Sequence, residues 1–295
     1  MAFIGRHTIA RPDMTRVFDS HVHFPTKEFI VDAGGPLVEH GLQYFGTKNP
    51  FRTQQQMVDE YKQAGISKAL LLGWDAETTT KRKGISNDTV AEWVQAYPDL
   101  FVGVASVDPH KGTKAVDELD RAIRKLDLKG LKLHPQVQAF RPDDPVYRPL
   151  WKKVNELKLP VVVHTGTSGL GAGSPGGDGI HLDYSRPIHI DSVAADFPDI
   201  TFLCAHAGWP WHEELLAMCM HKSNVFLDMS GWLPKYLPES VLRYANSRLS
   251  HKVIFGTDFP FFELQRCLDS LKDVQWKDGV LDKILWGNAA KIFRL

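Results

Sequence analysis

Two histidines separated by one residue, His21 and His23, lie in the stretch VFDSHVHF at residues 17–24. Its β-branched and aromatic residues predict a β-strand, and alternate side chains of a strand point to the same face. We therefore expect Asp19, His21 and His23 to share one face. Two imidazoles that converge from one rigid strand suit a divalent metal ion, so further ligands should lie elsewhere in the chain.

Polar residues with suitable chemistry end several other apolar stretches. A single histidine at a strand end is more often a hydrogen-bonded packing residue than a ligand. Here, however, five of the thirteen histidines fall at such ends, where a buried imidazole without a partner would cost about 1 to 3 kcal/mol. Metal binding would offset that cost. The residues in question, besides His21 and His23, are Lys132, His134, His164, His206 and Asp258.

The remaining histidines lie in predicted loops or helices, where surface or packing roles are expected. They are His7, His40, His110, His181, His189, His212, His221 and His251.

Eight short apolar stretches recur along the chain. Most are almost continuously hydrophobic, which is typical of strands covered by helices on both faces. They lie at 17–24, 68–75, 101–108, 130–135, 160–166, 200–208, 225–231 and 253–260.

Segments with helical periodicity separate these stretches, for example at 90–97, 116–126 and 150–157. Asn87 or Asp88 is expected to cap the first of them. Proline is common shortly after a helix, which it cannot extend. The prolines that follow predicted helices are Pro98, Pro160 and Pro198.

Eight alternating strand and helix units in 295 residues predict an α/β fold, a (β/α)₈ TIM barrel, with a doubly wound open sheet as the main alternative. No repeat or linker divides the chain, so we expect one domain over residues 1–295. Two long rim loops, 25–52 and 167–187, are expected to be functional, and the glycines of the second would permit a mobile lid. In a barrel the strand ends form a ring, so the polar residues above would face one bowl.

Composition limits the partners of the chain. Lys plus Arg and Asp plus Glu both number 35, so the zero net charge favours a small-molecule substrate over nucleic acid or an anionic membrane. No apolar stretch approaches the ~20 residues of a membrane span, and the N-terminus lacks the apolar region of a signal peptide. The cysteines have unrelated spacings, as expected for buried thiols of a cytoplasmic protein. They are Cys204, Cys219 and Cys267.

Six motifs in order carry a resemblance over the whole chain. They are HVH at 21–23, GLKLHP at 130–135, HTG at 164–166, HAG at 206–208, GTDFP at 256–260 and WGNAAKIF at 286–293. The chain resembles the amidohydrolase superfamily, and within it the branch that includes aminocarboxymuconate semialdehyde decarboxylase, γ-resorcylate decarboxylase and assorted hydrolases.

This resemblance implies a metal-dependent enzyme with a catalytic group, His206, near the metal-bound water. Zinc is the metal expected first, with manganese or iron as alternatives. Related proteins are often dimers, so a homo- or hetero-oligomer is possible. The metal ligands that the resemblance implies are His21, His23, His164 and Asp258.

Lys132 raises the question of a second metal ion, because binuclear members of the superfamily carry a fourth-strand lysine that reacts with CO₂ to form a bridging carbamate. Lys132 and His206 are therefore candidates for a second metal site. The alternative, which we favour, is one metal ion and a Lys132 that contacts a substrate carboxylate. His134, on the same strand face, is a further candidate for substrate binding.

Hydrolysis of an amide, lactone or ester is the main functional prediction. A metal ion lowers the pKa of bound water from about 15.7 toward 7, Asp258 would take its proton, and His206 would stabilise the oxyanion.

The first alternative is non-oxidative decarboxylation of an aromatic or unsaturated carboxylic acid. The decarboxylases that this chain resembles tend to have an acidic residue shortly after the sixth-strand histidine. The run HAGWPW has none, so Glu213 or Glu214 would have to substitute. Iron-dependent oxygen chemistry and a non-catalytic partner subunit are further alternatives.

Several tryptophans lie at or just beyond predicted strand ends, where they would line an aromatic bowl for a flat or apolar substrate, or else pack the rim helices. They are Trp74, Trp209, Trp211 and Trp232. Cations in the rim loops could bind a carboxylate or simply be solvated. They are Arg52, Lys81, Arg82 and Lys83.

Overall fold

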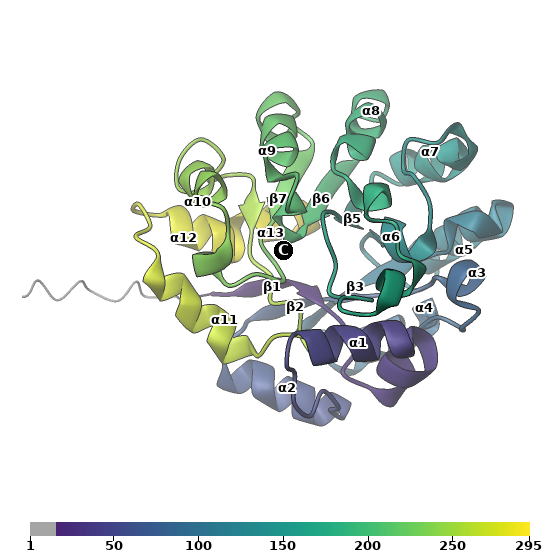
Figure 1. Ribbon diagram of the computed structural model, residues 1–295, viewed down its shortest axis with the longest axis horizontal. Helices are drawn as coiled ribbons and strands as arrows, with labels where there is room; N and C mark the ends of the chain where they lie inside the picture. Colours follow the sequence, from purple (N-terminus) through teal and green to yellow (C-terminus); the bar gives the residue numbers. More distant parts are fainter. Residues whose placement is uncertain (1–15) are drawn as a thin grey trace, which may run out of the picture.

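The structure, a computed structural model, describes residues 16–295, so His7 lies outside the described residues. Eight parallel strands form one sheet in the order β1 to β8 (Figure 1). The sheet closes on itself, because His23 N donates to Phe259 O at 2.8 Å and Val22 bridges to Phe259. The TIM barrel prediction is confirmed, and the open sheet is wrong. The strands are β1 (Phe18–Val22), β2 (Lys68–Leu72), β3 (Phe101–Ser106), β4 (Leu131–Leu133), β5 (Pro160–His164), β6 (Thr201–Ala205), β7 (Val225–Asp228) and β8 (Val253–Ile254).

Helices surround the strands, as Figure 1 shows. Each of the three periodic segments predicted to be helical is a helix: α4, α5 and α7. The helices are α1 (Pro36–Tyr44), α2 (Gln54–Gln63), α3 (Glu77–Thr80), α4 (Asn87–Ala96), α5 (Thr113–Arg124), α6 (Pro135–Gln138), α7 (Arg148–Glu156), α8 (Ile188–Asp196), α9 (His212–His221), α10 (Glu239–Ala245), α11 (Leu264–Ser270), α12 (Val280–Asp282) and α13 (Asn288–Phe293).

The start of α4 differs from the prediction. Ser86, not Asn87 or Asp88, is the N-cap, because its backbone is still extended and its hydroxyl accepts a hydrogen bond from Thr89 N at 3.0 Å. Pro160 begins β5, a position where its missing N–H is tolerated.

Apolar side chains fill the barrel from its N-terminal end. Phe18 packs against Phe293 of α13, with ring centroids 5.7 Å apart, and against Trp286 at 6.2 Å. Helix α13 lies behind the centre of the ring in Figure 1. Because this end is plugged, a site within the barrel must open at the C-terminal ends of the strands. The interior residues are Phe18, Leu70, Leu72, Val102, Val104, Val162, Leu203 and Ile254.

A β-bulge in β1 changes which side chains share a face. Asp19 pairs with Ala69 but Val22 pairs with Leu71, so β1 has one extra residue between them. The bulge places His21 inside the barrel, whereas the Asp19 carboxylate accepts hydrogen bonds from Thr257 and from Tyr61 of α2. The prediction that Asp19 shares a face with the two histidines is therefore wrong.

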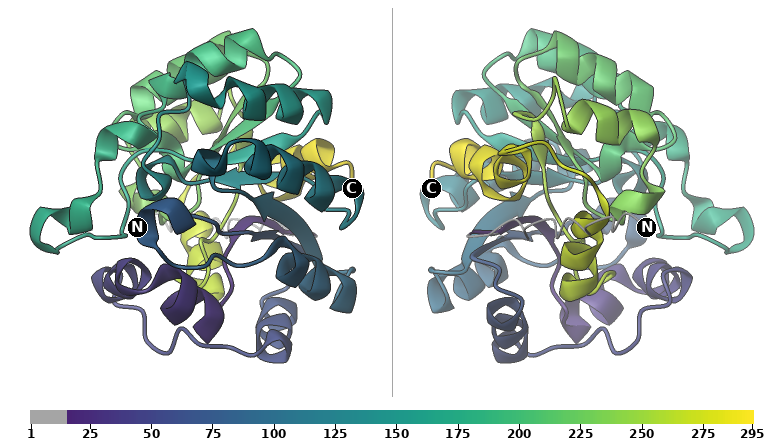
Figure 2. Two further views of the ribbon diagram at one scale, coloured as in Figure 1. Left: turned by 90° about the vertical axis from the view of Figure 1, so that its right-hand side faces the viewer. Right: turned by 90° about the vertical axis from the view of Figure 1, so that its left-hand side faces the viewer.

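The two long connections contain more structure than predicted. Segment 25–52 holds a π-helix at Glu28–Gly34 and helix α1. Segment 167–187 holds two short 3-10 segments and projects beyond the barrel on the side of α1 (Figure 2). His40 of α1 and Asp178 join the two connections, with 2.6 Å between Nδ1 and Oδ2.

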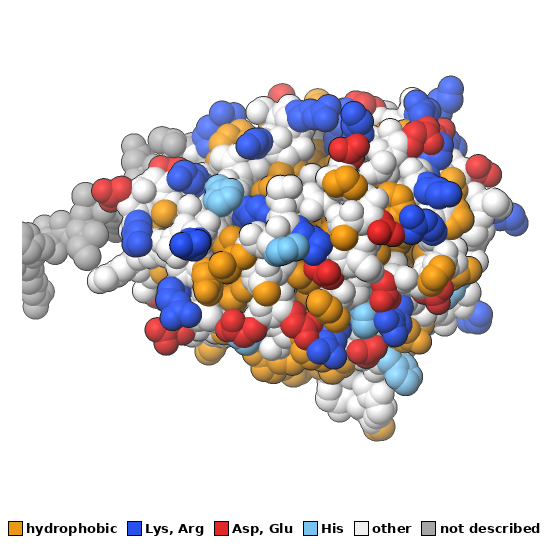
Figure 3. Space-filling model, turned by 90° about the horizontal axis from the view of Figure 1, so that it is seen from above, with side chains coloured by type: hydrophobic (Ala, Val, Ile, Leu, Met, Phe, Trp, Pro, Cys, Tyr) orange, Lys and Arg blue, Asp and Glu red, His pale blue; other side chains and the backbone are white. Residues whose placement is uncertain are grey.

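The surface carries both signs of charge. Figure 3 shows Lys and Arg interspersed with Asp and Glu on the face over α8 and α9, as the zero net charge suggests. All three cysteines are buried and unpaired. Among the described residues, no helix has the length and apolar character that a membrane crossing requires.

Candidate active site

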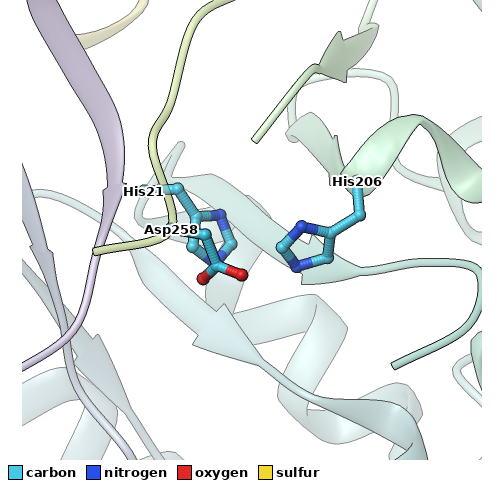
Figure 4. Close-up of side chains that lie close together, drawn as sticks. All are labelled: His21, His206 and Asp258. Carbon is cyan, nitrogen blue, oxygen red and sulfur yellow. The ribbon is translucent and has the colours of Figure 1, made fainter. Parts of the chain in front are cut away.

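Three side chains from distant parts of the chain converge at the C-terminal mouth of the barrel (Figure 4). His21 comes from β1, His206 follows β6, and Asp258 follows β8. Among the described residues, these three form a group in which one potential ligand atom of each lies within 4.8 Å of the others. All three are buried. The site thus lies where the ring of strand ends was predicted to place it.

The backbone turns sharply at two of these residues. His206 has a φ of 61° and Asp258 a φ of 66°, a left-handed conformation that costs side-chain-bearing residues roughly 1 kcal/mol or more. Gly231 approaches His206 so closely that an added Cβ would lie 2.6 Å from His206 Nδ1. The surrounding fold therefore holds both side chains in fixed positions.

Hydrogen-bond acceptors fix the tautomers of two of the imidazoles. His21 Nδ1 lies 3.0 Å from the Asp228 carboxylate, and His206 Nδ1 lies 3.0 Å from Ser230 O. In the neutral ring each Nδ1 donates its hydrogen, so Nε2 carries the lone pair. An acceptor behind the ring is the usual support for a metal-binding histidine.

The other two predicted metal ligands lie beside this group. His23 Nε2 is 3.5 Å from Asp258 Oδ1, and His23 Nδ1 is buried without a hydrogen-bond partner. His164 Nε2 donates to Thr167 O at 3.1 Å, which leaves the lone pair on Nδ1. The ring of His164 lies 4.5 Å from that of His206, between centroids.

Lys132 lies beneath the group. Its Nζ is 3.1 Å from His21 Nε2, and its side chain is buried. Burial lowers the pKa of this ammonium to about 8. His134, in contrast, lines the pocket above and stacks on His164, with centroids 3.9 Å apart. Lys132 and His134 were both predicted to contact the substrate. The structure places His134 on the pocket wall, whereas Lys132 lies against His21 and does not line the pocket.

Burial dominates the electrostatics of the site. It lowers the pKa of His206 to about 3 and the pKa values of His21, His23 and His164 well below their ordinary value, so these rings are neutral. Burial also raises the pKa of Asp258 to about 7. Neutral imidazoles, each with a lone pair on one ring nitrogen, together with a carboxylate, are a donor set that fits a divalent metal ion.

An apolar pocket of about 620 Å³ opens above the group. His23, His134, His164, His206 and Asp258 line its buried part. Three of the four tryptophans named from the sequence line it, and Trp211 does not. The aromatic lining consists of Trp74, Trp209 and Trp232 with Tyr44, Phe45, Tyr236, Phe261 and Phe262.

The predicted rim cations do not line this pocket. Arg52 pairs with Glu60, Arg82 donates to Val31 O at 3.1 Å, and Lys81 donates to Thr78 O at 2.6 Å.

Neither acidic candidate orients His206. Glu214 pairs with Arg186 at 2.6 Å, and Glu213 is exposed beside His212, so the proposed substitution for an acidic partner is wrong. The backbone carbonyl of Ser230 instead accepts the hydrogen of His206 Nδ1.

Three residues that contribute to the site were not identified from the sequence. Asp228 ends β7 and Ser230 lies two residues beyond it, both within the seventh apolar stretch, so the strand-end pattern that identified the other residues could have identified them too. Arg266 lines the pocket from α11. No sequence signal distinguishes it from other surface arginines.

Residues 18–295 match the family model described as Amidohydrolase. The chain belongs to the amidohydrolase family. Family membership makes this chain an enzyme with a divalent metal site and a small-molecule substrate, as the resemblance in its motifs predicted.

Two relatives are similar to this amidohydrolase-family protein in sequence. It is 22% identical to γ-resorcylate decarboxylase of a Polaromonas species, over 92% of this chain and 97% of that protein. A stretch of 114 residues is 29% identical to protein fluG of Emericella nidulans, and this chain matches only 12% of that longer protein.

Solved structures share the fold of this amidohydrolase-family protein. An uncharacterized TIM-barrel protein of Bordetella bronchiseptica is 25% identical, with a TM-score of 0.80 over 95% of this chain and 98% of that one. The 5-carboxyvanillate decarboxylase of Novosphingobium aromaticivorans with bound manganese is 18% identical, with a TM-score of 0.71 over 95% of this chain and 97% of that one.

Proposed function

We propose that this protein is a metal-dependent, non-oxidative decarboxylase of a flat aromatic or unsaturated carboxylic acid. The observation that carries the proposal is the position of Asp258, a buried carboxyl group at the floor of an aromatic pocket. The decarboxylase relative that matches nearly the full length of both chains supports it. Decarboxylation, the alternative in the sequence prediction, thus replaces hydrolysis as the preferred reaction.

The metal ion would be held by His21, His23, His164 and Asp258, with His206 as a further ligand candidate. When bound, it would attract the substrate carboxylate and a neighbouring oxygen and so fix the substrate in the pocket. Zinc and manganese both suit this donor set, and the manganese in a decarboxylase of the same fold favours testing manganese first. The buried thiols suit a cytoplasmic enzyme.

Asp258 would supply the proton. Its carboxyl group transfers a proton to the carbon that bears the carboxylate, the bond from this carbon to the carboxylate breaks, and the electron pair of that bond restores the unsaturated system as CO₂ leaves. Water then returns a proton to Asp258. In the metal-free site, burial raises the pKa of this carboxyl group to about 7 and a bound cation would lower it, so the assignment of Asp258 as the acid rests on its position at the floor of the pocket.

The flat walls of the pocket support an aromatic substrate. The ring of Trp74 stands nearly perpendicular to those of His23 and His134, with centroids 6.2 and 5.5 Å away. Phe261 meets His23 edge to face at 6.0 Å. Such an arrangement leaves planar surfaces against which a planar ligand packs well.

Hydrolysis is supported less well by the same geometry. The predicted hydrolytic role of His206 requires an N–H that polarises a carbonyl group. In the neutral ring that hydrogen is donated to Ser230 O, so the other nitrogen presents a lone pair. His206 is therefore better placed to accept a hydrogen or bind a metal ion than to stabilise an oxyanion.

A screen of aromatic and unsaturated acids, lactones and amides on manganese-loaded and zinc-loaded protein tests the proposal. We expect CO₂ release from one class of acid, with one deuterium incorporated at the vacated carbon in D₂O. Turnover of a lactone or amide without CO₂ release would establish hydrolysis instead. Oxygen consumption with reduced iron would establish oxygen chemistry.

A further inference from the structure

Arg266 is a charged side chain at the outer end of the pocket. It lies on α11 and is exposed, whereas Asp258 at the inner end is only 8% exposed. Among the lining residues, these two are the only Lys, Arg, Asp or Glu. The pocket therefore has one acidic group at its floor and one cation at its mouth.

The guanidinium of Arg266 makes no ion pair or hydrogen bond with any residue between 16 and 295. Of the acids on the same helix, Asp269 already accepts from Lys272 at 2.5 Å and from Gln265 at 3.0 Å. Glu263 lines a different cavity, together with Arg52. The positive charge of Arg266 is thus free to bind a ligand.

Within the described part of the chain, Arg266 differs from the surface arginines that are held in ion pairs, and it differs from unpaired Arg248 and Arg294 in lining the pocket. Arg121 binds Asp88 at 2.6 Å, and Arg148 binds Asp196 at 2.6 Å. An arginine at the mouth of a pocket differs from these in having a mostly apolar cavity in front of it. A charge-assisted hydrogen bond is stronger where aromatic walls exclude water.

Aromatic side chains line the same pocket as the two charged groups. Phe45 packs on Phe262 with centroids 4.8 Å apart, and Trp209 packs on Trp232 at 5.6 Å. A volume of about 620 Å³ is within the range of pockets that enclose ligands of drug size. A ligand that fills this space would reach from the floor to the mouth.

We propose that the substrate carries a second carboxylate, at the end opposite the carboxylate that is lost, and that Arg266 binds it. The planar guanidinium offers two parallel N–H groups, a match for a carboxylate. The inference rests on the proposed function for the placement of the first carboxylate at the metal end. It adds that the substrate is an elongated, planar dicarboxylate.

Binding of two isosteric probes to the manganese-loaded protein tests this assignment without requiring turnover. The probes are biphenyl-4,4′-dicarboxylate and its monoamide, which has the same shape but one charge fewer. Calorimetry, or quenching of the fluorescence of the lining tryptophans, measures the affinity. We expect the dicarboxylate to bind roughly tenfold more tightly than the monoamide.

The variant Arg266→Ala should abolish this difference and leave the affinity of the monoamide unchanged, while Arg266→Lys should retain part of it because the charge remains. Arg248→Ala is the matched control, since Arg248 is also exposed and lines none of the cavities described here. It should change neither affinity.

Three results would overturn the assignment: discrimination that persists in Arg266→Ala, equal weakening of both probes in that variant, or binding of neither probe to the wild type. The proposed function fails separately, if no acid releases CO₂ from a protein that still discriminates between the probes.

Discussion

His21 Nδ1 lies 3.0 Å from the carboxylate of Asp228, and neither side chain is accessible to solvent. The contact holds the imidazole in the tautomer whose Nε2 faces the site. The variant Asp228→Asn preserves size but loses the charge that favours this tautomer. We expect its metal affinity to fall roughly 10- to 100-fold, as measured by competition with a chromogenic chelator. Wild-type affinity in this variant would show that Asp228 does not support the metal site.

Gly231 provides a test of the position of His206. An alanine there would place Cβ 2.6 Å from His206 Nδ1 at a backbone φ of 72°. We expect Gly231→Ala to lower kcat roughly 100-fold by displacing the ring. The matched control is Gly279→Ala, where φ is 69° but no atom lies within 4 Å of the added Cβ. This control should lose only about 1 to 2 kcal/mol of stability and keep its activity. Equal activity losses in both variants would refute the argument.

Asp258→Asn removes the proton that the proposed reaction needs. We expect kcat for CO₂ release to fall by roughly 10² to 10⁴ in variant protein saturated with manganese, because general acid catalysis contributes about that much. Metal content, measured on the same sample by mass spectrometry, separates this effect from loss of a ligand. A metal-saturated variant with near wild-type turnover would exclude Asp258 as the acid.

Metal stoichiometry decides the role of Lys132. Its ammonium group lies 3.1 Å from His21 Nε2. We expect one equivalent of metal per chain in protein never exposed to chelator, and loss of activity on chelation that manganese or zinc reverses. The measurement is elemental analysis combined with ¹³C NMR after incubation in ¹³C-bicarbonate. Two equivalents and a carbamate signal would instead establish a binuclear centre.

The stability of the metal-free protein should depend on the neutrality of His206. Burial lowers its pKa from 6.5 in the unfolded chain to about 3 in the folded one. Below pH 6.5 the unfolded state therefore binds a proton at His206 that the folded state does not bind. The stability that the neutral His206 ring contributes is thus fully present above pH 6.5 and is lost as the pH falls toward 3.

Each pH unit in that window costs up to about 1.4 kcal/mol per histidine. Between pH 6.5 and about 5, we expect the free energy of unfolding of His206→Asn to fall by roughly 2 kcal/mol less than that of the wild type, measured by urea denaturation. Identical pH dependence in the two proteins would show that His206 is protonated in the folded state.

The strands and the residues at their ends could be predicted because burial on both faces leaves a local mark in the sequence. The stretch PVVVHTG illustrates this, since its valines require a covered strand and His164 then falls at the rim. The order of the six motifs along the chain likewise identified the family from local patterns. The metal ligands do not separate the two reactions, and hydrolysis was preferred because the run HAGWPW lacks the acidic residue that the resembled decarboxylases tend to have.

The face of Asp19 could not be predicted, because the bulge in β1 depends on pairing with β2 and not on the residues of β1 alone. The start of α4 was missed by one residue for a related reason. Ser, Asn and Asp are nearly equivalent as caps, so the backbone decides among Ser86, Asn87 and Asp88.

By itself the sequence determined the barrel, the ring of histidines and the aspartate at its mouth, since each depends on periodicity within a short stretch. Only the tertiary structure decided which ring nitrogen faces the site, because Asp228 and Ser230 reach His21 and His206 from another strand. It also decided that Arg266, out of the surface cations between residues 16 and 295, borders the pocket without a partner. Contacts of this kind depend on the angles and distances between segments far apart in the chain, and local patterns of residues do not encode them.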